Sequence, residues 1–128
     1  MITTHPVVDR ALAIVWTVEH LGLPEGFSTF SEYADWVDDL MDSAGYEEFY
    51  FKGQDGSTVG YVSVCISNDI HHKGDIFDVT SIVFKPRTAT APMVWRWVYA
   101  EAKRRGCHWV SRCEHEHDGS IRNIFKRV

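Results

Sequence analysis

Three side chains with metal-binding atoms alternate near the end of the chain. Cys113, His115 and His117 are separated by single residues, so in an extended segment all three point to one face. One thiolate and two imidazoles suit Zn²⁺, and His71 or His72 offers a fourth ligand. A second closely spaced pair, which zinc sites normally show, is missing, so a polar strand end is the competing interpretation. We therefore expect no metal site.

The same segment carries carboxylates that are candidates for a general base. Glu114 and Glu116 alternate with the histidines, and Asp78 lies on an earlier apolar run. A carboxylate within reach of an amine can accept its proton, provided that its pKa matches the task. Carboxylates at the end of a strand are also commonly only solvated, so both roles stay open. Nucleophilic catalysis has less support, because Ser81 and Ser111 have no neighbouring His-Asp pattern.

A strand and a helix precede this segment. Residues 76–84 (IFDVTSIVF) are rich in β-branched and aromatic side chains, which favour a strand. Pro86 ends the strand, because proline cannot donate a ladder hydrogen bond. A helix is predicted from near Pro92 to Arg105, with Gly106 as its C-terminal cap. Two further elements follow: a strand over residues 107–113 and, with Ser120 as its cap, a short helix over residues 120–125.

The order of these elements resembles the second half of the GNAT fold, which a large family of N-acetyltransferases shares. In that family a Gln/Arg-x-x-Gly-x-Gly/Ala loop and the helix that follows it hold the pyrophosphate of acetyl-CoA. Residues 87–92 (RTATAP) stand at the corresponding place. The resemblance implies an acetyl-CoA site formed by Arg87, Thr88, Ala89, Thr90, Ala91 and Met93.

The chain departs from the family pattern at several positions. Thr90 stands where the first glycine belongs, and its Cβ obstructs a close approach of the backbone to phosphate. Pro92 stands where Gly or Ala belongs, and it has no N–H to offer. Asp118 corresponds to the usual Asn, and Phe125 to the Tyr that often protonates the leaving thiolate. The family's last strand pair has no counterpart before Val128. The resemblance therefore predicts a truncated, degenerate GNAT domain that binds CoA weakly or not at all.

The first third of the chain predicts two helices. Apolar residues recur with helical spacing over residues 6–21, and Gly22 breaks the pattern. Thr29 and Glu32 form a capping-box signature for a second helix, which Gly45 ends. In the GNAT fold two such helices flank the entrance for the acceptor substrate.

The predicted fold class is α/β, with a mixed sheet and flanking helices in one domain. Residues 1–45 would form the two helices, and residues 46–128 the sheet, the long helix and the short last helix. The sheet would include a hairpin of residues 49–52 and 58–67 around the turn at 53–56. An initial strand has only residues 1–4 as a candidate.

Composition is typical of a packed globular protein. Hydrophobic residues make up 45% and aromatic residues 13%, and no apolar run approaches the roughly 20 residues that a membrane helix needs. The N-terminus lacks a secretory pattern. The three cysteines Cys65, Cys107 and Cys113 show no scaffold spacing, so reduced thiols in a cytoplasmic protein are expected.

Charge is distributed unevenly along the chain. Residues 1–84 hold 14 acidic and 3 basic residues, a balance of −11, whereas residues 85–128 hold 4 acidic and 10 basic residues, a balance of +6. Such asymmetry can mark an anion-binding face. A solvated surface whose basic half pairs with the acidic half is the expectation here, and nucleic-acid binding is not expected.

Aromatic and basic residues of the second half predict an interaction surface. If the chain lacks the last strands of the fold, the strand at 107–113 exposes an edge that proteins usually cover. A partner chain or a second copy would cover it through Trp95, Tyr99, Trp109 and Arg112. The alternative is that the helix at 120–125 shields the edge alone.

Two classes of function follow from the resemblance. The first is a degenerate GNAT-like module with a binding or structural role. Small proteins of this kind occur in phage genomes, including among virion proteins, so the host cytoplasm or the virion is the implied location. The second is an acyl-CoA-dependent N-acetyltransferase that acts on an amine or a protein, with Arg87 and the helix start at residues 91–93 on the pyrophosphate.

Overall fold

The computed structural model of the chain describes residues 2–85 and 90–128. A six-stranded sheet runs through it in the order β1-β2-β3-β4-β5-β6. The strands are β1 (Thr3–Pro6), β2 (Glu47–Lys52), β3 (Thr58–Ser67), β4 (Ile76–Phe84), β5 (Trp109–His115) and β6 (Ile121–Arg127). The helices are α1 (Arg10–Leu21), α2 (Phe30–Ala44) and α3 (Thr90–Arg104). Strands β4 and β5 are parallel and the other neighbours antiparallel, so the predicted mixed α/β class is confirmed.

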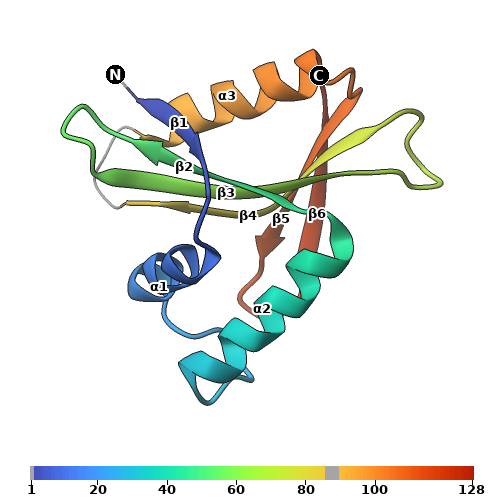
Figure 1. Cartoon of the computed structure of the whole chain (residues 1–128). Helices are drawn as coiled ribbons and strands as arrows, with labels where there is room; N and C mark the ends of the chain where they lie inside the picture. Colours follow the sequence, from blue (N-terminus) through green and yellow to red (C-terminus); the bar gives the residue numbers. More distant parts are fainter. Residues whose placement is uncertain (1, 86–89) are drawn as a thin grey trace.

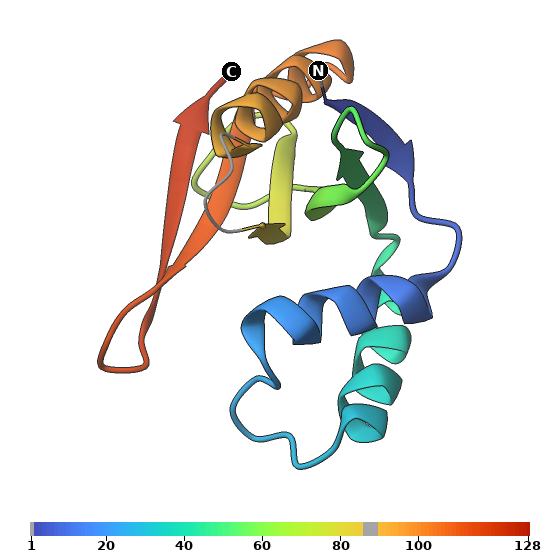
Figure 2. The same ribbon diagram turned by 90° about the vertical axis from the view of Figure 1, so that its left-hand side faces the viewer.

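The helices lie on both faces of the sheet. Helix α3 covers one face, and α1 and α2 lie beneath the other (Figures 1 and 2). The main apolar core lies under α3, where alternate residues of the strands meet one helical stripe. Its buried members include Phe51, Val62, Val64, Phe77, Val79, Val94, Val98 and Val110. In the described residues, no helix is long and apolar enough to cross a membrane.

Two helix ends follow the predicted capping chemistry. The Thr29 hydroxyl accepts a hydrogen bond from the Glu32 N–H at 3.2 Å, which fixes the start of α2. Gly106 has φ of 76°, a left-handed conformation that suits glycine after a helix. Its N–H bonds the Lys103 carbonyl at 3.1 Å, and the Cys107 N–H bonds the Ala102 carbonyl at 2.9 Å. This pair of bonds is a Schellman motif, so the predicted cap of the long helix is confirmed.

The prediction for the last element was wrong. Residues 121–127 form strand β6, which pairs antiparallel with β5 along its whole length, and not a helix over 120–125. The turn between them is held by Asp118, whose carboxylate accepts from the Ser120 N–H at 2.9 Å and from the Ser120 hydroxyl at 2.6 Å. Strand β5 is therefore not an edge strand, and the premise of an uncovered edge at 107–113 was also wrong.

The N-terminal boundaries also differ from the prediction. Residues 3–6 pair with β2 as a strand, and helix α1 begins only at Arg10. The Asp9 side chain caps that helix by accepting from the Ala11 N–H at 3.0 Å. Helix α3 starts at Thr90, two residues before Pro92.

Strands β4 and β5 separate after a short parallel contact. Only Ile76–Val79 of β4 pair with Trp109–Arg112 of β5, although β4 continues to Phe84 and β5 to His115. Figure 2 shows β5 diverging from β4 beyond this contact. Strand β4 carries a bulge at Thr80, directly after this contact, because the register with β3 shifts between Ser63 and Val64. The splay and the bulge lie next to each other in the sheet.

Candidate functional site

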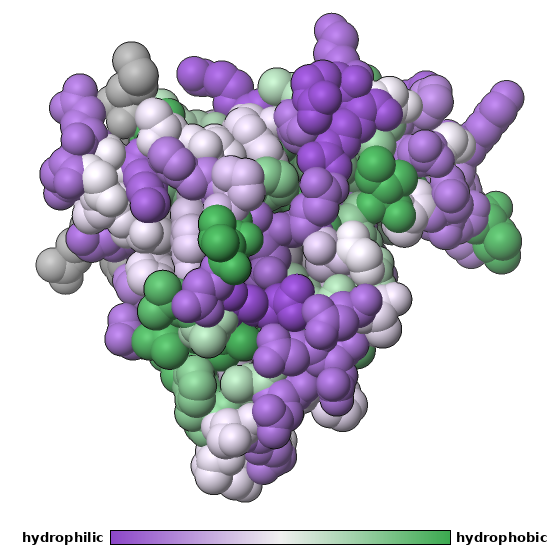
Figure 3. Space-filling view, viewed as in Figure 1, coloured by the Kyte–Doolittle hydropathy of each residue, from purple (hydrophilic) through white to green (hydrophobic). Residues whose placement is uncertain are grey.

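A pocket lies between the two N-terminal helices and the sheet. Its volume is about 330 Å³, and its walls come from α1, the α1–α2 loop, α2, β3 and β4. Figure 3 shows hydrophobic side chains gathered over α1, next to a largely hydrophilic surface over α2. Among the described residues, the lining contains no Asp, Glu, His, Cys, Lys or Arg. The pocket can therefore enclose a group by apolar contact and by hydroxyl hydrogen bonds.

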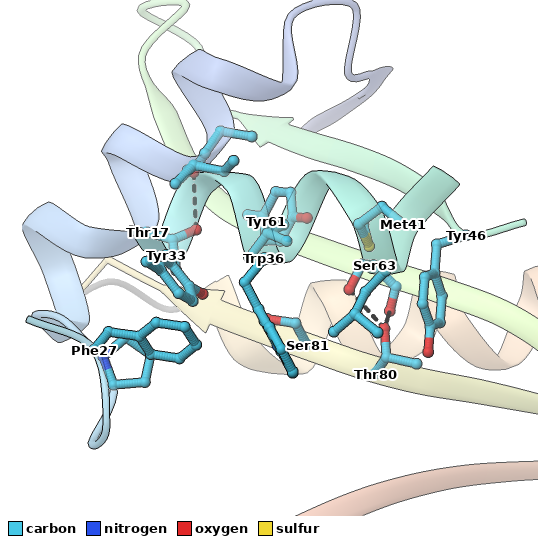
Figure 4. A pocket seen from close by; sticks show the side chains of 15 residues that line it. Thr17, Phe27, Tyr33, Trp36, Met41, Tyr46, Tyr61, Ser63, Thr80 and Ser81 are labelled. Carbon is cyan, nitrogen blue, oxygen red and sulfur yellow. Dashed lines mark hydrogen bonds between the residues drawn. The ribbon is translucent and has the colours of Figure 1, made fainter. Parts of the chain in front are cut away.

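Aromatic side chains form the wall nearest to solvent. The Phe27 ring meets Tyr33 edge-on with centroids 5.1 Å apart, and it meets Trp36 edge-on at 6.1 Å. Trp36 is 58% exposed and Leu40 is 48% exposed, so these two residues stand at the mouth. Figure 4 shows Phe27, Tyr33 and Trp36 along one side of the pocket.

Hydroxyl groups form the inner end of the pocket. Ser63 on β3 and Thr80 on β4 share a hydrogen bond at 2.7 Å, and the Thr80 hydroxyl reaches the Ser63 carbonyl at 3.1 Å (Figure 4). Thr80 is the extra residue of the β4 bulge, since Ser63 pairs with Ser81 and Val64 with Val79. Because of the bulge, the consecutive residues Thr80 and Ser81 both line the pocket.

An ion-pair network holds the helices over the sheet. The Arg10 guanidinium of α1 bonds Asp42 of α2 at 2.8 Å and Glu48 of β2 at 3.0 Å. The Tyr61 hydroxyl donates to the same Glu48 carboxylate at 2.6 Å. Burial, reinforced by this bond to an anion, raises the pKa of Tyr61 well above its ordinary value. Burial likewise raises the pKa of Tyr33 and of Tyr46, so the phenols that line the pocket stay protonated near neutral pH.

The carboxylates predicted as a general base lie outside the pocket lining. Glu114 pairs with Arg122 at 2.5 Å and with Arg112 at 2.8 Å, and these arginines lower the pKa of its carboxyl group. Glu116 lies 3.5 Å from Arg122. A carboxylate that two guanidinium groups stabilise is a poor proton acceptor. Both glutamates therefore fit a structural role at the β5–β6 turn better than a catalytic one.

Asp78 lies on β4, two residues before Thr80 of the pocket lining. It pairs in register with Cys65 of β3 and Ser111 of β5, and the Ser111 hydroxyl donates to its carboxylate at 2.7 Å. Its charge also contributes to the raised pKa of Tyr46, a pocket residue, behind the larger effect of burial. Asp78 stands at the last part of the β4–β5 contact, just before the strands separate.

The alternating sulfur and nitrogen side chains do not form a ligand set. His117 lies in the turn after β5, and the Cys113 thiol donates to the Asn123 side chain at 3.1 Å. In the part of the chain that the structure describes, no three His, Cys, Asp or Glu side chains gather as metal ligands. His72 instead stacks on Phe125 with ring centroids 3.9 Å apart.

The predicted cofactor segment is described only in part. Arg87, Thr88 and Ala89 lie outside the described residues. Thr90 is 2% exposed, and its methyl group packs close to Gly60 of β3, so its side chain faces the core. Ala91 is half-buried and Met93 is exposed, both in the first turn of α3. Among the first N–H groups of that helix, which lack intrahelical acceptors, the one at position 92 is absent because the residue is proline.

The residues predicted as a partner surface are engaged within the chain. Trp95 and Tyr99 pack against the core under α3, and the Arg112 guanidinium lies 5.7 Å from the centre of the Trp95 ring. The Trp109 indole donates to the Lys73 carbonyl at 3.0 Å and meets His72 edge-on at 4.9 Å.

Sequence reasoning missed the pocket, although it placed the elements that build it. The pocket residues Tyr33, Val37, Leu40 and Met41 have the spacing of an apolar helix stripe, and helical spacing alone does not separate a core stripe from a pocket wall. The bulge at Thr80 was missed as well, although the consecutive polar residues Thr80 and Ser81 interrupt the alternation of residues 76–84.

Comparison with known proteins agrees with the fold. No family model matches the chain. A GNAT family acetyltransferase of Staphylococcus aureus superposes with a TM-score of 0.68 at 12% identity, covering 96% of this chain and 93% of that one. An aminoglycoside 6'-N-acetyltransferase of Acinetobacter baumannii gives 0.64 at 13% identity over 92% and 83% of the two chains. A Clostridium acetobutylicum protein, described as a predicted acetyltransferase with acetyl-CoA, gives 0.60 at 13% over 86% and 79%.

A protein with a similar amino-acid sequence comes from a bacteriophage. Protein 7 of Escherichia phage T7 is 46% identical over 125 residues, which cover 94% of this chain and 92% of that protein. Identity at this level over nearly the full length of both proteins indicates common descent. The chain has a GNAT-like fold and belongs to the same family as Protein 7 of phage T7.

Proposed function

We propose that this chain is a phage protein in which the GNAT fold serves as a binding module and no longer as an acyltransferase. The observation that carries the proposal is the pocket itself. It offers aromatic surface and hydroxyl groups, and its described lining contains no side chain that could take a proton from an amine at neutral pH. The glutamates predicted for that task are paired with arginines elsewhere.

The cofactor segment supports the same proposal. Acetyl-CoA would supply a thioester-activated acetyl group, and in this fold it would lie at the separation of β4 and β5 near the start of α3. Of the residues proposed to hold it, Thr90 turns its side chain into the core, and next to Ala91 the residue Pro92 removes one N–H from the helix start. Within the described residues, the start of α3 thus offers one N–H donor fewer than a helix start without proline.

Calorimetric titration with acetyl-CoA and with CoA tests this proposal. We expect weak binding or none. Micromolar affinity that Arg87→Ala abolishes would overturn the proposal and favour an active enzyme. Arg96→Ala, which removes a cation from the exposed side of α3, is the matched control for loss of one positive charge.

A second candidate is an acyl-CoA-dependent N-acetyltransferase, and the position of Asp78 favours it. The carboxylate is held by Ser111 beside the pocket and next to the strand separation. In such an enzyme Asp78 would accept the proton that the attacking amine loses, while the hydroxyls of Thr80 and Ser81 would orient the acceptor. Asp78→Asn would then abolish release of CoA in the presence of an acceptor amine, and Glu114→Gln would leave it unchanged.

The proposed location is the host cytoplasm or the virion, which the phage relative supports. Mass spectrometry of purified virions and of the infected-cell extract would distinguish the two.

A protein partner or second copy at Trp95, Tyr99, Trp109 and Arg112 also stays a proposal. Sedimentation over a concentration series tests self-association, and a monomer at every concentration would exclude it.

A further inference from the structure

The mouth of the pocket continues into a row of carboxylates on α2. Trp36 and Leu40 are one helical turn apart and form the rim. Glu32 lies one turn before Trp36, and Asp39 lies three residues after it, so both border the same edge of the helix. Exposed apolar side chains and acids therefore share one surface, which we call the α2 rim (Glu32, Asp35, Trp36, Asp39 and Leu40).

The acids of the α2 rim differ from those that bind α2 to α1. Asp38 and Asp42, which follow Asp35 and Asp39 by three residues on α2, bond Arg10 at 3.3 Å and 2.8 Å. In the described part of the chain, Glu32, Asp35 and Asp39 take part in no ion pair. Among the described residues, neither the pocket lining nor the rim carries a basic side chain. The first 84 residues have a balance of −11, so the field at this surface favours a cationic ligand.

We infer that the α2 rim and the pocket dock a basic protein segment, with one large apolar side chain in the pocket and Lys or Arg residues beside the carboxylates. This inference rests on the proposed binding role of the pocket and names the partner that the role requires. Size favours a protein segment over a small amine. A volume of about 330 Å³ is near the lower limit for ligand pockets and suits a single large side chain. The acids extend outside the pocket for roughly 10 Å along the helix, the span of about three extended residues.

Fluorescence anisotropy with two synthetic peptides tests the inference. One labelled peptide carries a single Trp among Lys and Arg residues, and the other has the same sequence with Glu in place of each basic residue. We expect the basic peptide to bind at least about tenfold more tightly, and added salt to weaken it, since both effects follow from opposite charge. Equal affinity of the two peptides would overturn the inference.

Variants locate the peptide on the surface. Trp36→Ala should weaken the basic peptide by about tenfold or more, as expected for a central aromatic contact, and the exposed position of Trp36 leaves the fold intact. The double change Glu32→Gln with Asp39→Asn should weaken it by about fivefold, whereas Glu116→Gln, which removes a charge at the β5–β6 turn, should have no effect. Unchanged affinity in Trp36→Ala would contradict the inference.

A competition experiment separates this inference from the proposed function. If butylamine displaces the basic peptide at concentrations similar to those of an unlabelled copy, the pocket takes small amines and the segment proposal fails. The peptide affinities are measured without acetyl-CoA, so they do not depend on the calorimetric result. Failure here would therefore leave the proposed loss of CoA binding intact, and binding of CoA would leave the peptide preference intact.

Discussion

At the scale of single residues, Glu48 connects the fold to the pocket. Its carboxylate is only 8% exposed, and it accepts from Arg10 of α1 and from the Tyr61 hydroxyl at the pocket wall. An anion so far removed from water needs such partners, because a buried charge without them is strongly destabilising. One side chain thus fixes the position of α1 and the orientation of a pocket phenol.

This arrangement predicts a loss of stability at alkaline pH. The pKa of Tyr61 is raised in the folded state, so its contribution is complete below the unfolded pKa of about 10 and is lost as the pH rises toward the folded value. The free energy of unfolding should therefore decrease above about pH 10, by up to about 1.4 kcal/mol per pH unit for one such group. Urea unfolding from pH 8 upward measures it.

Tyr61→Phe provides the control for this pH dependence. The variant cannot ionise at this position, so its stability should depend less steeply on pH above about 10 than that of the natural chain. Tyr33, Tyr46 and Tyr50, whose pKa values burial also raises, would leave a residual slope. Identical slopes in the two proteins would show that Tyr61 titrates in the folded state as an ordinary phenol.

At the scale of secondary-structure elements, the end of α3 gives a direct test of backbone conformation. Gly106 has φ of 76°, and a Cβ added there would meet no atom within 4 Å, so only the backbone opposes a side chain. Gly106→Val should lower the free energy of unfolding by about 1–2 kcal/mol, because a β-branched residue is strained in this conformation. Gly106→Asn, which tolerates it better, should cost less. Equal effects of Val and Asn in thermal unfolding would be inconsistent with the left-handed cap.

Amide hydrogen exchange tests the separation of β4 and β5. Residues 109–112 of β5 have strand partners on both sides, whereas residues 113–115 have β6 alone. All amides of 109–112 should therefore exchange slowly, and alternate amides of 113–115 should exchange faster. Uniform protection along β5 would mean that β4 stays paired with it to the end, without a splay.

These elements also show which parts of the fold the sequence predicts. Thr29 and Gly106 were identified correctly because caps depend on local chemistry that a short segment contains. Residues 120–125 were predicted as a helix because Ser120 can cap one, although Asp118-Gly119 between two extended runs is a hairpin signal. Strand β6 is stabilised by pairing with β5, a tertiary contact that local propensity does not contain.

At the scale of the whole molecule, the two faces of the sheet have different roles. The face under α3 holds the main core, with Val62, Val64 and Phe77 fully buried. The opposite face is covered by α1 and α2, which leave a pocket lined with hydroxyls and aromatic rings. Predicting that pocket from sequence requires the distance between helices and sheet, which the Arg10–Glu48 ion pair sets and no spacing of residues encodes.

The central claim is that a GNAT-like fold here binds through the helix-side pocket and not through an acetyl-CoA site. Titration of the ¹⁵N-labelled protein with acetyl-CoA, followed by NMR, tests this claim most directly. We predict no saturable shift at the start of α3 (Thr90, Ala91 and Met93) or at the separating ends of β4 and β5, up to millimolar ligand. Saturable shifts confined to these residues, absent in Arg87→Ala, would contradict the account.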